Sequence, residues 1–173
     1  MKQKKIQCKI PFQTIQEGTH EFTFIIKKSF IEQYEIEEVL DANMTVTVVL
    51  QKKTRLHPLN YSIKGTITVP CDRCLDDCIV ELKTQDSLIV TTASDDQEST
   101  DADDIYYIKP NETEINISNH IYESIILALP LQKIHSEGMC NKEVEKHILS
   151  NEHTKQKNND ESIWDSLQNI FDN

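Results

Sequence analysis

Apolar and polar residues alternate with a period of two along much of the first half of the chain. In the segment 43–51, NMTVTVVLQ, every second residue from Met44 to Leu50 is apolar. The segment 60–69, NYSIKGTITV, repeats the pattern from Tyr61 onward. Because a period of two is typical of a strand with one buried face, we predict two strands here. The polar sequence KKTRLHPLN between them suits a hairpin loop.

Further short strands are predicted from apolar runs bounded by turn residues. Gly18 marks a turn between the first two of them, and the segment 28–40 has no clear pattern. The predicted strands are IQCKIPF at 6–12, HEFTFII at 20–26, the stretch from Cys78 to Val90, IYYI at 105–108 and EINI at 114–117.

The periodicity changes at residue 118, where SNHIYESIILALP predicts a helix over 119–129. Ile121, Ile125 and Leu129 fall on one face of this helix. Ser118 or Asn119 is the expected N-cap, and Pro130 ends the helix. A second, short helix is predicted over 141–149.

Together these elements predict an α+β domain over residues 1–149. It is built on an antiparallel sheet that can curl toward a barrel, with one main helix packed on it. A cysteine knuckle lies between two of its strands. Residues 95–104, DDQESTDADD, are acidic and lack large apolar side chains, so we expect a flexible, solvated loop.

The C-terminal part of the chain is more polar. Residues 150–161 are predicted to be a linker, followed by an amphipathic helix over 162–171. Such a short helix is marginal alone in water and must dock on its own domain or on a partner. Trp164 and Leu167 are its expected anchors, because aromatic side chains often dominate small interfaces.

The 173-residue chain has a net charge of −11, and its acidic excess lies in residues 76–173. Proteins that mainly grip phosphates are usually basic, so extensive nucleic-acid binding is disfavoured. No apolar run is long enough for a membrane helix, and the N-terminus lacks the apolar core of a secretory signal. We therefore expect a cytoplasmic protein, monomeric and not membrane-bound.

Three cysteines lie close together in VPCDRCLDDC, which spans residues 69–78. Cys71 and Cys74 form a C-x-x-C at the turn between two predicted strands, which supplies half of a tetrahedral zinc site. His135 and Cys140, just after the main helix, can supply the other half. A zinc site of the Cys3His type would tie the turn to that loop and stabilise a small domain.

Two other interpretations of these cysteines are open. The thiols can be a reduced cluster without a metal, or Cys71 and Cys74 can be a redox pair. The redox interpretation is the weaker one, because a thioredoxin-like motif opens a helix. Cys78 shares a strand face with apolar residues and is expected in the core, with a role as a substitute ligand as the alternative. Cys8 is also expected in the core.

Nothing in the sequence resembles a catalytic motif, so we expect a protein that is not an enzyme. With three scattered glycines, the chain has no glycine-rich phosphate loop. Basic residues gather in the predicted hairpin loop and the knuckle. These candidates for contact with RNA or a partner are Lys52, Lys53, Arg55 and Arg73.

Three sequence features together resemble the YceD family, the large ribosomal RNA subunit accumulation proteins of bacteria and plastids. They are VPCDRCL at 69–75, IILALPL at 125–131, and the following His135 and Cys140. IWDSLQNI near the C-terminus resembles the short tail motif of the family. The resemblance covers about residues 36–173, and Cys78 is an additional thiol.

The resemblance implies a non-catalytic factor in large ribosomal subunit biogenesis that supports accumulation or processing of 23S rRNA. The expected partners are ribosome assembly proteins or large-subunit rRNA precursors. Two alternatives are a direct RNA-binding or RNA-processing module and a zinc- or thiol-containing adaptor for protein interactions. A purely redox function is a third alternative.

Overall fold

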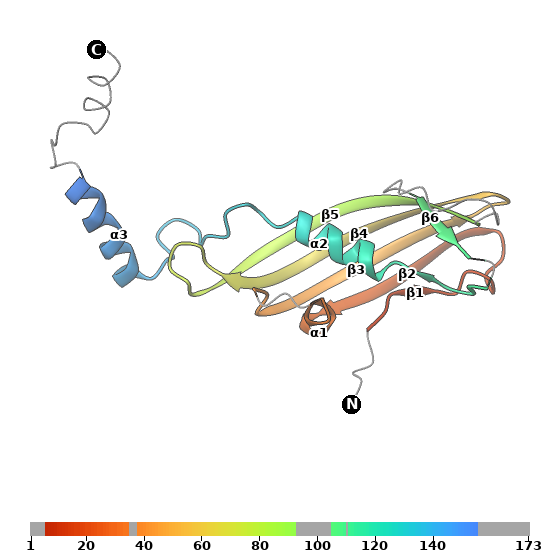
Figure 1. Ribbon diagram of the computed structural model, residues 1–173, viewed down its shortest axis with the longest axis horizontal. Coiled ribbons are helices and arrows are strands. Elements are labelled where there is room, and N and C mark those ends of the chain that lie inside the picture. Colours follow the sequence, from red (N-terminus) through yellow and green to blue (C-terminus); the bar gives the residue numbers. More distant parts are fainter. Residues whose placement is uncertain (1–5, 35–37, 93–104, 110, 156–173) are drawn as a thin grey trace, which may run out of the picture.

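The computed structural model describes residues 6–34, 38–92, 105–109 and 111–155. Two sheets and three helices form the described part of the chain (Figure 1). In chain order the elements are β1 (Lys9–Ile10), β2 (Gly18–Lys27), α1 (Lys28–Glu32), β3 (Asp41–Lys52), β4 (Leu56–Pro70), β5 (Asp77–Thr92), β6 (Ile105–Ile108), β7 (Ile115–Asn116), α2 (Ser118–Leu127) and α3 (Lys142–Lys155).

The main sheet has five strands in the order β2-β3-β4-β5-β6. The first four are antiparallel neighbours, as predicted, whereas β6 pairs with β5 in parallel. Short turns join β3 to β4 and β4 to β5, and the segment between β2 and β3 contains α1. The expected curl into a barrel is wrong, because β2 and β6 lie at opposite edges and the sheet is open. Helices α1 and α2 and the β1–β7 pair cover one face of this open sheet (Figure 1).

One face of the main sheet forms the core. The predicted apolar face of β3, from Met44 to Leu50, is buried, as are Ile63 and Ile67 of β4. Helix α2 adds Ile121 and Ile125, both fully buried. The opposite face carries mainly polar side chains and is not covered by any described element. Burial of this single apolar face explains why the period of two is so clear in the sequence.

Gly65 allows two central strands to approach closely. Its φ is +152°, and a Cβ atom there would lie 2.3 Å from the carbonyl oxygen of Asn43 and 2.5 Å from Cα of Met44. Both obstacles are backbone atoms of the neighbouring strand, so they cannot rotate away. The glycine is therefore required by the packing of β4 against β3.

Helix α2 begins one position earlier than predicted, and its N-terminus is stabilised by a residue outside it. Asn116 Oδ1 accepts hydrogen bonds from the backbone N–H and the hydroxyl of Ser118, at 3.1 and 2.6 Å. The Ser118 hydroxyl oxygen in turn accepts the N–H of Cys8 at 2.8 Å. These bonds join the helix start to the N-terminal segment, so Ser118 connects elements instead of acting as a simple N-cap.

A polar cluster fixes α2 on the sheet. The Tyr61 hydroxyl lies 2.8 Å from the Ser124 hydroxyl, and both lie 3.1 Å from Oδ2 of Asp86. Burial is the main cause that raises the pKa of Tyr61, so this phenol stays protonated at neutral pH. The cluster places the end of α2, and hence the loop that follows it, at a defined position over β4 and β5.

Helix α3 is longer than predicted. It begins at Lys142 and continues to Lys155, past the expected end at residue 149 and into the segment predicted as a linker. The acidic segment 95–104 and the predicted C-terminal helix with Trp164 and Leu167 lie outside the described residues. None of the helices that the structure describes is long and apolar enough to cross a membrane.

Candidate metal centre

The cysteine knuckle is the turn that connects β4 to β5. Cys71 directly follows the last residue of β4, and its carbonyl accepts the N–H of Leu75 at 2.9 Å. The N–H of Cys71 donates to the carbonyl of Asp76, also at 2.9 Å. This tight turn directs Cys71 and Cys74 to one place, where both side chains are buried.

The loop after α2 is bound to this turn by main-chain and side-chain hydrogen bonds. The N–H of Asp72 donates to the carbonyl of Lys133 at 2.8 Å, and Asp72 Oδ2 accepts the N–H of Lys133 at 2.6 Å. The ammonium group of Lys133 also forms an ion pair with Glu38 at 3.2 Å. The loop consequently brings His135 and Cys140 to the knuckle, at the end of the sheet where α3 begins (Figure 1).

The four residues predicted as zinc ligands converge. Their ligand atoms all lie within 4.8 Å of one another. Cys74 Sγ is 3.4 Å from His135 Nδ1, Cys140 Sγ is 3.9 Å from the same nitrogen, and Cys71 Sγ is 4.0 Å from Cys140 Sγ. In a tetrahedral zinc site, S–S and S–N distances are about 3.8 and 3.6 Å. The arrangement thus fits a metal of that size with small adjustments.

His135 is oriented for metal binding through Nδ1. Its Nε2–H donates to the carbonyl oxygen of Asp77 at 3.0 Å. Because a carbonyl can only accept, the proton of the neutral ring lies on Nε2, and the lone pair of Nδ1 faces the cysteine sulfurs. A hydrogen bond from the ring nitrogen that does not bind the metal is the usual means by which proteins fix a histidine ligand.

The cysteines of the cluster have very different proton affinities. Burial opposes ionisation of Cys71, but the backbone N–H groups of Cys74, Arg73 and His135 outweigh it and lower its pKa to about 6. Burial, followed by the interactions with Cys71 and Cys74, raises the pKa of Cys140 to about 11. Without a cation, Cys71 therefore ionises far more readily than Cys140. A divalent metal would supply the positive charge that lets all three ionise.

Cys78 packs against the four-residue cluster but is not one of the ligand set. It is buried beside Cys71, Cys74 and Cys140, and not in the large apolar core of the sheet. Burial and the neighbouring sulfurs raise its pKa. The expectation of a buried thiol is confirmed, but its neighbours are the cysteines. Cys8 is buried in the main core, as predicted.

The basic residues predicted to meet RNA or a partner differ in their availability. The ammonium group of Lys52 donates to the carbonyls of Phe12 and Ile15 at 2.8 and 2.7 Å, so it stabilises the fold. Lys53 and Arg55 are exposed in the β3–β4 turn. Arg73 lies 3.9 Å from a carboxylate oxygen of Glu145 on α3.

Several features of the centre have no signal in the sequence. The Asp77 carbonyl that orients His135 and the amide groups around Cys71 are backbone atoms. The reciprocal bonds between Asp72 and Lys133 join residues 61 positions apart. Residues so far apart have no spacing that the sequence could reveal, whereas the C-x-x-C spacing and the residue types of His135 and Cys140 pointed to the four ligands.

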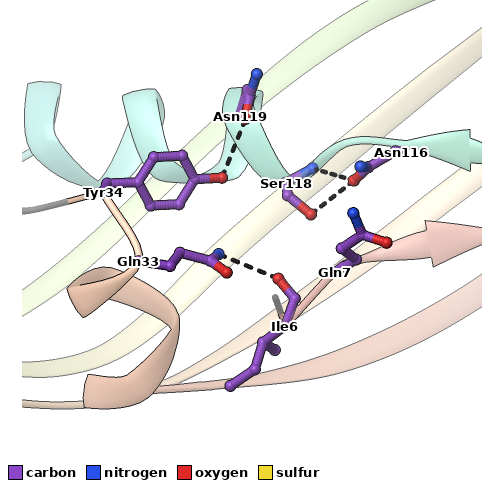
Figure 2. Close-up of a pocket in the computed structure, with 7 residues that line it drawn as sticks. All are labelled: Ile6, Gln7, Gln33, Tyr34, Asn116, Ser118 and Asn119. Atoms are coloured by element: carbon purple, nitrogen blue, oxygen red, sulfur yellow. Dashed lines mark hydrogen bonds between the residues drawn. The ribbon is translucent and has the colours of Figure 1, made fainter. Parts of the chain in front are cut away.

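A second concave site lies at the start of α2, in a hollow of about 200 Å³ (Figure 2). Amide side chains dominate its lining, and the Tyr34 hydroxyl donates to Asn119 Oδ1 at 3.1 Å. Gln33 donates to the carbonyl of Ile6, while its own Oε1 is buried without a described partner. The described residues that line this hollow include no acid, histidine or cysteine.

Comparison with known proteins places the chain in a family. A search of curated proteins and a search of solved structures each returned no match. The model of one family, described as "Large ribosomal RNA subunit accumulation protein YceD", matches residues 59–171. The matched region includes β4, β5, α2 and all four residues of the candidate metal centre. Since it covers well over half of the sequence, the chain belongs to the YceD family.

Proposed function

We propose that this protein is a non-catalytic factor in large ribosomal subunit biogenesis and supports accumulation or processing of 23S rRNA. The observation that carries the proposal is the family match over residues 59–171, whose description names large-subunit ribosomal RNA accumulation. The expected site of action is the cytoplasm, and the expected partners are assembly proteins or large-subunit rRNA precursors.

The role proposed for the metal centre is structural, with zinc as its metal. Three cysteines and one histidine are a donor set typical of structural zinc, and four protein ligands leave no open position for a substrate. The centre would join the β4–β5 turn to the loop between α2 and α3. It would thereby hold α3 in place and present the surface around it to a partner.

A protein-adaptor role is favoured over extensive direct contact with RNA. The chain has a net charge of −11, and Lys52, one of the four basic candidates, is engaged with backbone carbonyls. Of the other three, Arg73 lies 3.9 Å from a carboxylate oxygen of Glu145, and Lys53 and Arg55 are exposed cations in one turn. Two such contacts would provide little of the counterion release that drives phosphate binding.

The proposal can be tested in cells that lack the gene for this chain. We expect the ratio of mature 23S to 16S rRNA to fall and to be restored by the unchanged protein. The variant Cys78→Ala, which keeps all four proposed ligands, should restore it as well, whereas Cys140→Ser should not. An unchanged ratio in the deletion strain would contradict the function, and full rescue by Cys140→Ser would contradict the role of the metal.

A further inference from the structure

Large apolar side chains are exposed on the segments that form the metal centre. Leu75 of the knuckle is 78% exposed, and Leu131 and Met139 of the loop after α2 are 102% and 72% exposed. Hydrogen bonds of Asp72 and Asp77 join these two segments. We call these three apolar residues the knuckle patch. Exposed apolar residues that gather in one region usually mark an interaction site.

Leu75 is unusual in its backbone as well as in its exposure. Its φ of +64° is the only positive value among the described residues other than glycine. The left-handed conformation costs a leucine about 1 kcal/mol, and glycine or asparagine would adopt it more easily. The side chain gains no burial in the described part of the fold. A strained residue with an exposed apolar side chain therefore suggests a binding role.

The part of the chain that follows α3 has matching apolar side chains and a suitable length. Residues 162–171 have the sequence SIWDSLQNIF, with apolar residues at helical spacing. Helix α3, with 14 residues, is about 21 Å long and begins two positions after Cys140. Residues 156–162 can span about 24 Å when extended, so the segment that follows can reach back to the knuckle patch.

We propose that residues 162–171 dock on the knuckle patch of their own chain, with Trp164 and Leu167 against Leu75 and Met139. The short tether makes this docking intramolecular, with an effective concentration in the millimolar range. Docking would cover the apolar side chains around the metal centre and would repay the strain at Leu75. The inference does not depend on the proposed ribosomal function.

Trp164 is the only tryptophan, so its fluorescence reports on this segment directly. In the full-length protein as isolated, we expect an emission maximum blue-shifted from that of the chain in denaturant, and low quenching by acrylamide. The double variant Leu75→Asn, Met139→Gln should shift the emission to the red and increase quenching at least twofold. Asparagine suits the left-handed conformation, so the turn itself should remain intact.

The control variant is Ile25→Thr, which removes a 64% exposed apolar side chain from the face of the main sheet opposite α2. This variant should leave the emission unchanged. Native emission equal to that of the denatured chain would overturn the proposal. So would an emission that the double variant leaves unchanged, because the segment would then dock elsewhere. A blue shift that disappears on dilution would assign the segment to a second copy of the chain and would also overturn it.

Discussion

The ring of His135 donates its Nε2–H to the carbonyl oxygen of Asp77 at 3.0 Å, which leaves Nδ1 facing the sulfurs of Cys74 and Cys140. The histidine is thus held in the tautomer that a metal requires. Asp77 is the first residue of β5, so the long strand pairing between β4 and β5 positions this carbonyl. The pairing of these two strands therefore fixes the orientation of the His135 ring.

Metal binding should weaken as the pH falls. A bound metal requires thiolates and a neutral imidazole, so binding releases protons. Below about pH 6 the Cys71 thiol becomes protonated even in the folded protein. There we expect zinc affinity, measured by competition with a chromophoric chelator, to fall at least tenfold per pH unit. An affinity that stays constant between pH 7 and 5 would exclude ligation by these residues.

His57 should make the fold less stable in acid. Burial, and then the charge of Lys52, lower its pKa below the ordinary value of 6.5, and its Nδ1 accepts the N–H of Lys53 at 3.0 Å. The unfolded chain therefore binds a proton more readily than the folded chain. This contribution to stability is complete above pH 6.5 and is lost as the pH falls from 6.5 through the lower pKa of the folded state.

The substitution His57→Asn isolates that contribution, because asparagine keeps an acceptor but does not titrate. Urea unfolding of both proteins at several pH values gives the difference in their free energies of unfolding. We expect the advantage of the parent protein to shrink between pH 6.5 and 5. A difference that does not change over this range would show that His57 titrates normally.

Gly65→Ala should be strongly destabilising. The added methyl group would overlap backbone atoms of Asn43 and Met44, and we expect a loss of about 3 kcal/mol in the free energy of unfolding. Gly138→Ala is the matched control. Gly138 has a φ of +76° but no atom within 4 Å of the added carbon, so its loss should be about 1 kcal/mol. Equal losses in urea titrations would contradict the close approach of β3 and β4.

Much of the sheet and the whole candidate ligand set could be predicted from the sequence. Val46 and Ile63 face each other on β3 and β4, and their alternating neighbours show a period that only a half-buried strand explains. Cys71, Cys74, His135 and Cys140 are residue types with a strong preference for zinc. These predictions depend on local patterns or on side-chain chemistry, both of which are visible in the sequence.

The pairing of short strands could not be predicted in the same way. Ile10 of β1 pairs with Ile115 of β7, and each of these strands has two residues. A strand of that length has no periodicity, and its partner is chosen by the packing of the whole core. The parallel pairing of β6 beside β5, which contributes to the open sheet, depends on the same tertiary context.

Direct binding to RNA should be weak and unspecific if the protein is an adaptor. We expect fluorescence anisotropy to show low affinity for 23S rRNA fragments. The double charge reversal Lys53→Glu, Arg55→Glu should lower this affinity only slightly. The control double variant Lys27→Glu, Lys83→Glu should lower it by a similar amount. All four side chains are exposed cations, but only the first pair lies in the β3–β4 turn. Tight, salt-sensitive binding that only the first double variant abolishes would favour the RNA-binding alternative.

The metal content of the purified protein tests the central claim most directly. Elemental analysis of the full-length chain, together with native mass spectrometry, should find one zinc per chain. Cys140→Ser should lose the zinc and unfold at a lower temperature, because a structural zinc can contribute roughly 10 kcal/mol. Cys78→Ala, which alters a buried thiol beside the ligand set, should retain it. Two results would contradict the account. One is a purified chain that holds less than one zinc even after zinc is added; the other is a Cys140→Ser variant that binds zinc as the parent protein does.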